Sequence, residues 1–140
     1  ANNLKLNGAH GTLLNHSEHK LKLNDLKKAV LMAKKAKLKI VICAATPSEV
    51  NKVKVLKPDY IAIEPPKLIA GNISVSESKP QAITNSVKLT KLPVLCGAGI
   101  KTREDVEKAI KLGAKGILIS SGIVLNKNKI KILTEMAKAI

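Results

Sequence analysis

Two short apolar runs of the chain end beside ionisable side chains. His16 follows residues 11–15, GTLLN, and Glu64 closes residues 60–64, YIAIE. Imidazole and carboxylate groups give and take protons in general acid–base catalysis. Each residue alone has an ordinary explanation, because a histidine can finish a turn and Glu64 precedes a proline, where the backbone stays extended. If the fold brings both to one pocket, however, they are suited to move a proton on a substrate.

Small residues follow two later apolar runs. Gly99 lies in the sequence GAG after the run LPVLC, and Ser120 and Ser121 end the run GILIS and begin SSG. Glycine-rich turns and helix N-termini are common phosphate sites. Such glycines can also be plain turn formers, and the serines can cap a helix.

Five short apolar runs alternate with longer segments of helical periodicity. The runs are nearly continuous rather than alternating, as expected of parallel strands that are buried on both faces. We therefore predict an α/β fold of five βα units, which forms either a doubly wound sheet or a (β/α) barrel. In both folds, ligands meet the carboxyl ends of the strands, where the candidate residues lie. The runs are residues 11–15, 39–44, 60–64, 92–97 and 116–120.

The segments between the runs carry helix signals. An initial segment that ends near Gly8 is typical of the tail of a helix. The last helix would have Ile130, Leu133 and Ala137 on one side. The predicted starts are Asn24, Thr46 with a capping box to Glu49, Ser78 with Pro80, Thr102, and about Lys127.

The composition limits the function classes. The 140 residues are 45% hydrophobic and 25% charged, which suits one domain with a real core. The net charge of +15 would suit a nucleic acid, but Arg103 is the only arginine and Tyr60 is the only aromatic residue. The chain therefore has almost no arginine to hydrogen-bond base edges and almost no aromatic rings on which bases could stack. We expect no specific nucleic-acid partner.

Cysteines and apolar segments indicate the cellular setting. Cys43 and Cys96 each lie in a strand-like run, so we expect two buried free thiols rather than a disulfide or a metal site. No apolar run approaches the roughly 18 to 20 residues that span a bilayer. The start ANNLKLNGAH also lacks the apolar region of a signal peptide. We expect a cytoplasmic protein without a membrane partner.

Taken in order, the motifs resemble those of triosephosphate isomerases of the compact archaeal type. The resemblance is carried by GTLLNHSEHK, PDYIAIEPPKLI and VLCGAGIKTREDVEKAIKLGAKGILISSGIV. It implies a (β/α)8 TIM barrel, of which this chain covers about five βα units, strands 4 to 8. It also implies the interconversion of dihydroxyacetone phosphate and D-glyceraldehyde 3-phosphate in glycolysis and gluconeogenesis. A homo-oligomer, dimer or tetramer, would catalyse it without cofactor or metal.

The resemblance also assigns roles to residues. Glu64 would be the base that removes a proton from the substrate, and a neutral His16 would stabilise the charged oxygen of the enediolate intermediate. This family is the standard example of such a division between base and hydrogen-bond donor. Glu18 would pair with the family's active-site lysine, and a lid would cover residues 65–76. Substrate and phosphate contacts would fall on Ile69, Gly71, Gly99, Ser120 and Ser121.

The chain departs from the family pattern in length and in two motifs. A barrel of this kind has eight strands and about 250 residues, or about 200 in compact forms. Residues 1–140 would therefore form a single partial barrel domain without the three N-terminal βα units. The family's Asn-x-Lys motif does not start this chain, and residues 70–72, AGN, replace Gly-Thr-Gly in the lid. We expect a truncated or incompletely recorded enzyme with exposed sheet edges.

Two other functions stay open at this point. Another phosphate-binding barrel enzyme could use the GAG and SSG segments with a base other than Glu64. A noncatalytic half-barrel could instead assemble with copies of itself, or bind polyanions through its lysines.

Overall fold

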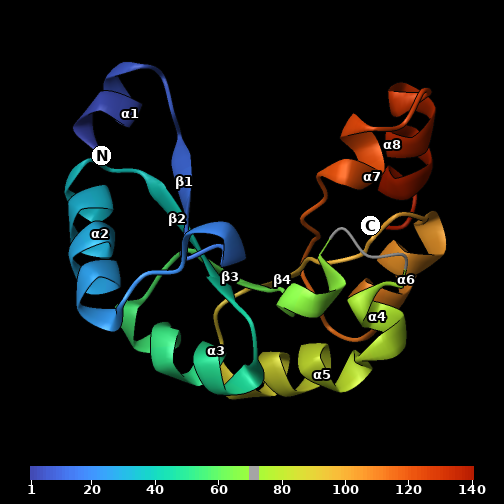
Figure 1. The fold of residues 1–140 in the computed structure, drawn as a ribbon, viewed down its shortest axis with the longest axis horizontal. Coiled ribbons are helices and arrows are strands. Elements are labelled where there is room, and N and C mark those ends of the chain that lie inside the picture. The colour runs from blue at the N-terminus through green and yellow to red at the C-terminus, as the bar shows by residue number, and fades with distance from the viewer. Residues whose placement is uncertain (70–72) are drawn as a thin grey trace.

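A parallel sheet forms the centre of the computed structural model, which describes residues 1–69 and 73–140 (Figure 1). The strands lie in the order β1-β2-β3-β4, and all three pairings are parallel. They agree with the first four predicted strands to within two residues at each end. Their bounds are β1 (Gly11–Leu14), β2 (Lys39–Ala44), β3 (Tyr60–Ile63) and β4 (Val94–Cys96).

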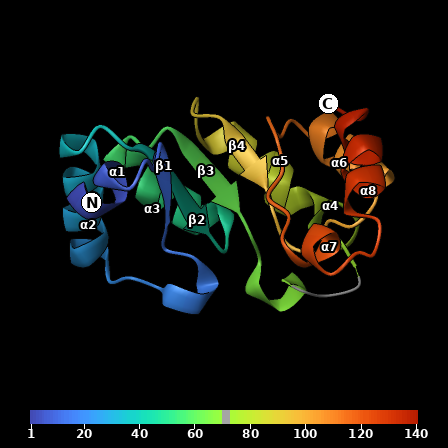
Figure 2. The same ribbon diagram turned by 90° about the horizontal axis from the view of Figure 1, so that it is seen from above.

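Helices connect successive strands and lie in an arc outside them (Figure 1). Seen from above, the strands lie between α2 at one end and α6 and α8 at the other (Figure 2). In residues 1–69 and 73–140, no helix is long and apolar enough to cross a membrane. The helices are α1 (Asn2–Leu6), α2 (Leu23–Lys35), α3 (Pro47–Val53), α4 (Val75–Ser78), α5 (Pro80–Leu89), α6 (Arg103–Lys111), α7 (Ser121–Val124) and α8 (Lys129–Ala137), and the 3-10 turns are η1 (Ser17–His19), η2 (Lys54–Leu56) and η3 (Pro66–Leu68).

The strand order decides between the two predicted architectures. A doubly wound sheet reverses its strand order at a switch point, so some strands adjacent in sequence are not neighbours in space. Here each strand pairs with the next along the chain. Helices α2, α3 and α5 each contact two successive strands of the sheet. The chain therefore forms an open arc of a (β/α) barrel, as the resemblance implied.

The fifth predicted strand is reduced to a bridge. Residues 116–120 pair with β4 through an isolated parallel bridge between Cys96 and Ile117. The Cys96 N–H donates to the Gly116 carbonyl, and the Leu118 N–H donates to the Cys96 carbonyl, both over 2.9 Å. Within the described residues this run has a partner on one side only, so the ladder ends there. The predicted position was right and the predicted extent was wrong.

The capping signals succeed where a side chain meets the helix backbone. Thr102 accepts a hydrogen bond from the Asp105 N–H, and the Asp105 side chain accepts from the Thr102 N–H, which completes a capping box. Asn24 was a wrong prediction, because α2 begins at Leu23 and the Lys22 carbonyl accepts its first helical hydrogen bond. Helix α1 ends before Gly8, as predicted.

Two other helix starts differ from their predictions. Pro80 opens α5, but Lys79 rather than Ser78 precedes it, and Ser78 ends α4. The last helix begins at Lys129, two residues later than predicted.

The last helix also leaves its apolar side uncovered. Ile130 and Leu133 are 83% and 55% exposed, whereas Met136 is buried. Val124, the last residue of α7, and Leu125 after it are exposed as well. The exposed apolar surface agrees with the expectation for a partial barrel.

The core lies between the middle strands and the helices. Ile42 and Ile61 are completely buried, and Val50 and Ile83 pack on them from the helices. Strand β1 is only partly buried, because it is the edge of the sheet and Leu13 is exposed. Burial on both faces was therefore predicted correctly for β2 and β3 and wrongly for β1.

Ile61→Ala is expected to lower the free energy of unfolding by about 2 to 5 kcal/mol, since it removes a fully buried side chain from a central strand. Ile130→Ala, at a position that is 83% exposed, is the control and should change it by less than about 0.5 kcal/mol. Urea unfolding of both variants measures the difference, and equal losses would contradict this assignment of the core.

Candidate active site

A pocket of about 330 Å³ opens at the carboxyl ends of the strands. Segments that follow β1, β3, β4 and residues 116–120 contribute to its wall. It contains every sequence-predicted site residue except Gly71, which lies outside the described residues, as does part of the predicted lid. The lining residues are Leu13, His16, Glu18, Glu64, Ile69, Ala98, Gly99, Ile100, Lys101, Leu118, Ile119, Ser120, Ser121 and Gly122.

His16 stands where β1 gives way to η1. Asn15 before it has a φ of 62°, in the left-handed region that asparagine tolerates better than most residues. The Glu18 N–H donates to His16 Nδ1 over 3.4 Å. A neutral imidazole whose Nδ1 accepts a hydrogen bond carries its proton on Nε2. That Nε2 atom lies 3.9 Å from Glu64 Oε2.

Glu18 lies at the rim of the pocket. Its carboxylate Oε2 is 3.5 Å from His16 Nδ1, but its side chain is 87% exposed. Water therefore screens this pair, and its contribution to stability is small. In this structure Glu18 is a solvated acid in the first turn of η1.

Glu64 directly follows β3 and is buried. Its N–H donates to the Ala44 carbonyl over 2.8 Å, which continues the sheet ladder past the end of the strand. Only 8% of the residue is exposed. Its Oε2 atom has no hydrogen-bond partner among residues 1–69 and 73–140. Because buried carboxylate oxygens are normally paired, this oxygen is available to a ligand that enters the pocket.

Gly97 provides the space for the Glu64 carboxyl group. A Cβ atom at this position would overlap Glu64 Oε1 and lie 2.6 Å from its Cγ. The glycine is therefore required by close packing rather than by a turn. The sequence analysis treated it as a possible turn former and missed this contact.

Two buried thiols flank the same carboxylate. Burial raises the pKa of the Cys43 thiol, and the neighbouring Glu64 raises it further. Burial first and Glu64 second raise the pKa of Cys96 to about 12. Both cysteines are free and buried, as the sequence predicted.

We expect neither thiol to react with dithiobis(nitrobenzoic acid) in the folded protein at about pH 8, since reaction requires an accessible thiolate. Both should react once a denaturant unfolds the chain. Absorbance of the released thiolate counts the reactive groups. A rapid reaction of one thiol before unfolding would contradict the burial of these side chains.

Backbone turns also line the pocket. Ala98 and Gly99 have φ values of 71° and 75° in succession, and a Cβ at Gly99 would overlap the Ile73 carbonyl. Ser120 precedes α7 but, in the described structure, its side chain makes no capping hydrogen bond. Helix capping therefore does not explain Ser120. Ser121 lies beside it at the start of α7.

The sequence patterns did not single out some other lining residues, among them Lys101. It follows Ile100 in the pocket wall and also lines a neighbouring pocket. Its place directly after the GAGI turn, beyond a predicted strand end, was the signal that could have identified it. Leu13 from β1, and Leu118 and Ile119 from residues 116–120, add apolar surface. Among the described residues, no group of three or more His, Cys, Asp or Glu side chains could hold a metal ion.

Known proteins match the chain over most of its length. The family model of triosephosphate isomerase matches residues 1–137. A triosephosphate isomerase of Methanothermus fervidus is 40% identical over an alignment of 134 positions, which covers 92% of this chain and 60% of that protein. One of Pyrobaculum islandicum is 43% identical over an alignment of 143 positions, which covers 99% of this chain and 62% of that protein. The chain thus spans about three fifths of the length of these relatives.

A solved structure shares the fold at low sequence identity. Thiamine phosphate pyrophosphorylase from Pyrococcus furiosus has a TM-score of 0.75 and 17% identity, over 97% of this chain and 61% of that one. At this identity the similarity supports the barrel architecture alone. With the family model matching nearly every residue and the pocket at the strand ends, the chain belongs to the triosephosphate isomerase family.

Proposed function

We propose that these residues carry the acid–base site of a triosephosphate isomerase, which interconverts dihydroxyacetone phosphate and D-glyceraldehyde 3-phosphate. The chain spans about 60% of the length of its relatives, so the activity is proposed for a protein of that length that contains residues 1–140. One observation carries the proposal: Oε2 of buried Glu64, which has no hydrogen-bond partner within the described residues, lies 3.9 Å from His16 Nε2 in a single pocket.

The proposed reaction moves one proton between two carbons. Glu64 removes a proton from carbon 1 of dihydroxyacetone phosphate, and the electron pair of the broken C–H bond forms the enediolate. His16 donates from Nε2 to the oxygen that gains charge. The carbon 1 hydroxyl then gives its proton to the carbon 2 oxygen by way of His16, while the carbon-bound proton returns from Glu64 to carbon 2; this gives the carbon 1 aldehyde and the carbon 2 hydroxyl and restores the Glu64 carboxylate. The step is redox-neutral overall and requires no cofactor.

The phosphate group would bind at the backbone turns of the pocket. Gly99, Ser120 and Ser121 line the pocket, and the left-handed turn at Ala98 and Gly99 is typical of backbone anion sites. Ile69 lines the pocket from the segment after β3. The proposed Gly71 contact belongs to the lid. Lys101, a basic residue, also lines the pocket.

A direct assay tests this function. A chain of the relatives' length that contains these residues should convert dihydroxyacetone phosphate to glyceraldehyde 3-phosphate. A second enzyme that oxidises the aldehyde makes this conversion measurable. Inorganic phosphate should compete with the substrate, since it occupies the anion site. A folded protein without turnover would reject the proposal in favour of another phosphate-binding barrel enzyme or a noncatalytic assembly. We expect the active form to be a homo-oligomer, a dimer or tetramer, which sedimentation would establish.

A further inference from the structure

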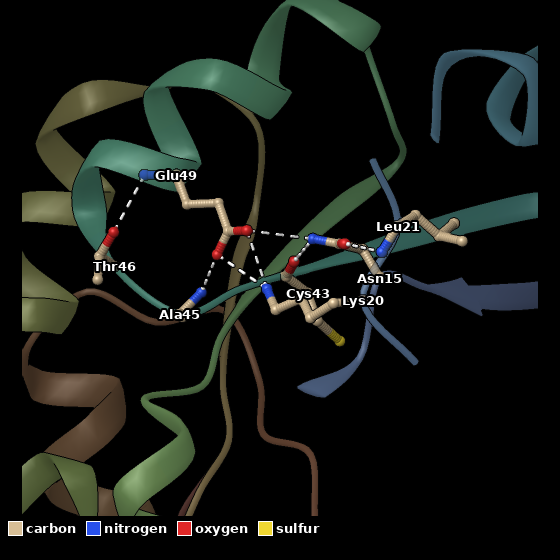
Figure 3. Close-up of polar contacts among 7 residues, drawn as sticks. All are labelled: Asn15, Lys20, Leu21, Cys43, Ala45, Thr46 and Glu49. Atoms are coloured by element: carbon tan, nitrogen blue, oxygen red, sulfur yellow. Dashed lines mark hydrogen bonds and ion pairs between the residues drawn. The ribbon is translucent and has the colours of Figure 1, made fainter. Parts of the chain in front are cut away.

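One polar cluster ties both ends of the segment that carries His16 (Figure 3). Asn15, which is 5% exposed, donates from Nδ2 to the Cys43 carbonyl over 2.9 Å and to Glu49 Oε1 over 3.4 Å. Its Oδ1 accepts from the Leu21 N–H over 3.0 Å. The residue before His16 thus holds the end of the loop and joins it to β2 and α3.

Glu49 is the centre of this cluster. Its carboxylate accepts from the Ala45 N–H and from Asn15, and both of its oxygens lie 2.9 Å from Lys20 Nζ. Burial raises the pKa of Glu49, but the hydrogen bonds from Ala45 and Lys20 outweigh it, so the pKa lies below its ordinary value of 4.5. The carboxylate is therefore ionised at neutral pH and pairs with Lys20 from the His16 loop.

The cluster is more than a helix cap. The Thr46 hydroxyl accepts from the Glu49 N–H over 3.2 Å, so Thr46 already caps α3. The predicted capping box is only half formed, because the Glu49 carboxylate turns to Ala45 and the His16 loop instead of the Thr46 N–H. Figure 3 shows the carboxylate between the start of α3 and the loop residues. Its main partners are thus outside the helix to which it belongs.

We propose that Glu49 is a positioning residue for His16 and acts through Asn15 and Lys20. The side chains of Glu49, Asn15 and Lys20 fix both ends of the loop of residues 16–20. They thereby fix the direction in which His16 Nε2 faces Glu64. Errors of about 1 Å in such groups can cost about a hundredfold in rate. This role deepens the proposed isomerase function and rests on it.

The first test is a set of variants in a chain of the relatives' length. Glu49→Ala should lower kcat about 10- to 100-fold and change KM less than about threefold, because the substrate-binding wall is untouched. Glu49→Gln keeps an acceptor for the Ala45 N–H and should recover part of the loss. Asn15→Gly permits the same backbone conformation but removes the amide. The Glu49→Ala/Asn15→Gly double variant should lose about as much as the worse single variant, because both act in one network.

Asp59 offers a matched control at the amino ends of the strands. Its Oδ2 accepts from the Ile40 N–H over 2.9 Å, and its Oδ1 pairs with Lys39 Nζ over 2.7 Å, much as Glu49 pairs with a backbone N–H and a lysine. Asp59→Ala should lower stability but keep kcat within about twofold, since it acts far from the pocket. The proposal is overturned if the kcat of Glu49→Ala stays within about twofold of the parent value. It is also overturned if Asp59→Ala lowers kcat as much as Glu49→Ala does.

A spectroscopic readout separates this proposal from the isomerase assignment. If the parent protein lacks isomerase activity, the proposed function fails. The positioning of His16 by Glu49, Asn15 and Lys20 is then judged by nuclear magnetic resonance alone. Glu49→Gln, or Lys20→Met if that variant does not fold, should shift the His16 ring signals. It should also speed hydrogen exchange at the Leu21 amide about tenfold, because the loop end opens locally. Unchanged His16 signals and unchanged exchange would overturn the proposal.

Discussion

Glu64→Gln is expected to lower kcat of the proposed isomerase by about 10³-fold, the usual scale for losing a general base. The amide has nearly the size of the carboxylate but cannot take a proton from carbon. KM should change little, because the substrate contacts proposed for Gly99, Ser120 and Ser121 remain. Steady-state kinetics on the purified variant measure both constants.

The same substitution should preserve the fold. Glu64 Oε2 has no partner within the described residues, so an amide at that position breaks no hydrogen bond to this oxygen. A thermal melting curve close to that of the parent protein is the control. Activity that stays within about tenfold of the parent would assign the base to a different residue.

Gly97→Ala is expected to lower kcat about 100-fold, because the added methyl group would displace the carboxylate that acts as base. The overlap involves Glu64 Oε1, Cγ and Cδ, so the added methyl group would push directly on this buried side chain. The kinetic constants of the variant give the size of the effect.

Gly116→Ala is the matched control for this substitution. A Cβ at Gly116 would lie 3.2 Å from the end of the Leu95 side chain, which can move, and Gly116 does not line the pocket. Its kcat should stay within about threefold of the parent, because the added methyl group would meet only the Leu95 side chain and would not touch Glu64. Equal losses at the two glycines would show that any added methyl group in this region disturbs the enzyme, and would refute the specific role of Gly97.

The sequence alone predicted the parts of the fold that depend on local pattern. Continuous apolar runs marked β2 and β3, and Thr102 with Asp105 marked the start of α6. The strand ends identified His16 and Glu64, since polar residues after parallel strands must meet at one edge of the sheet. The choice of a barrel over a doubly wound sheet needed the resemblance, and the observed strand order then confirmed it.

Features that depend on contacts distant in sequence could not be predicted. Glu49 was assigned to a capping box because Thr46 lies three residues before it, whereas its carboxylate pairs with Lys20, which lies 29 residues away. Gly97 gave no local sign that it faces Glu64. The fifth strand had a suitable pattern but a partner on one side only, within the described chain, and pattern does not report the number of neighbours.

Isotope transfer from solvent provides the most direct test of proton transfer by Glu64. Dihydroxyacetone phosphate is converted in deuterium oxide, and the glyceraldehyde 3-phosphate is trapped and examined by proton magnetic resonance. A carboxylic acid that holds the proton exchanges it with solvent, so we predict deuterium at carbon 2 of the product. A product that carries only the original hydrogen would indicate direct hydride transfer between the carbons and would contradict the account.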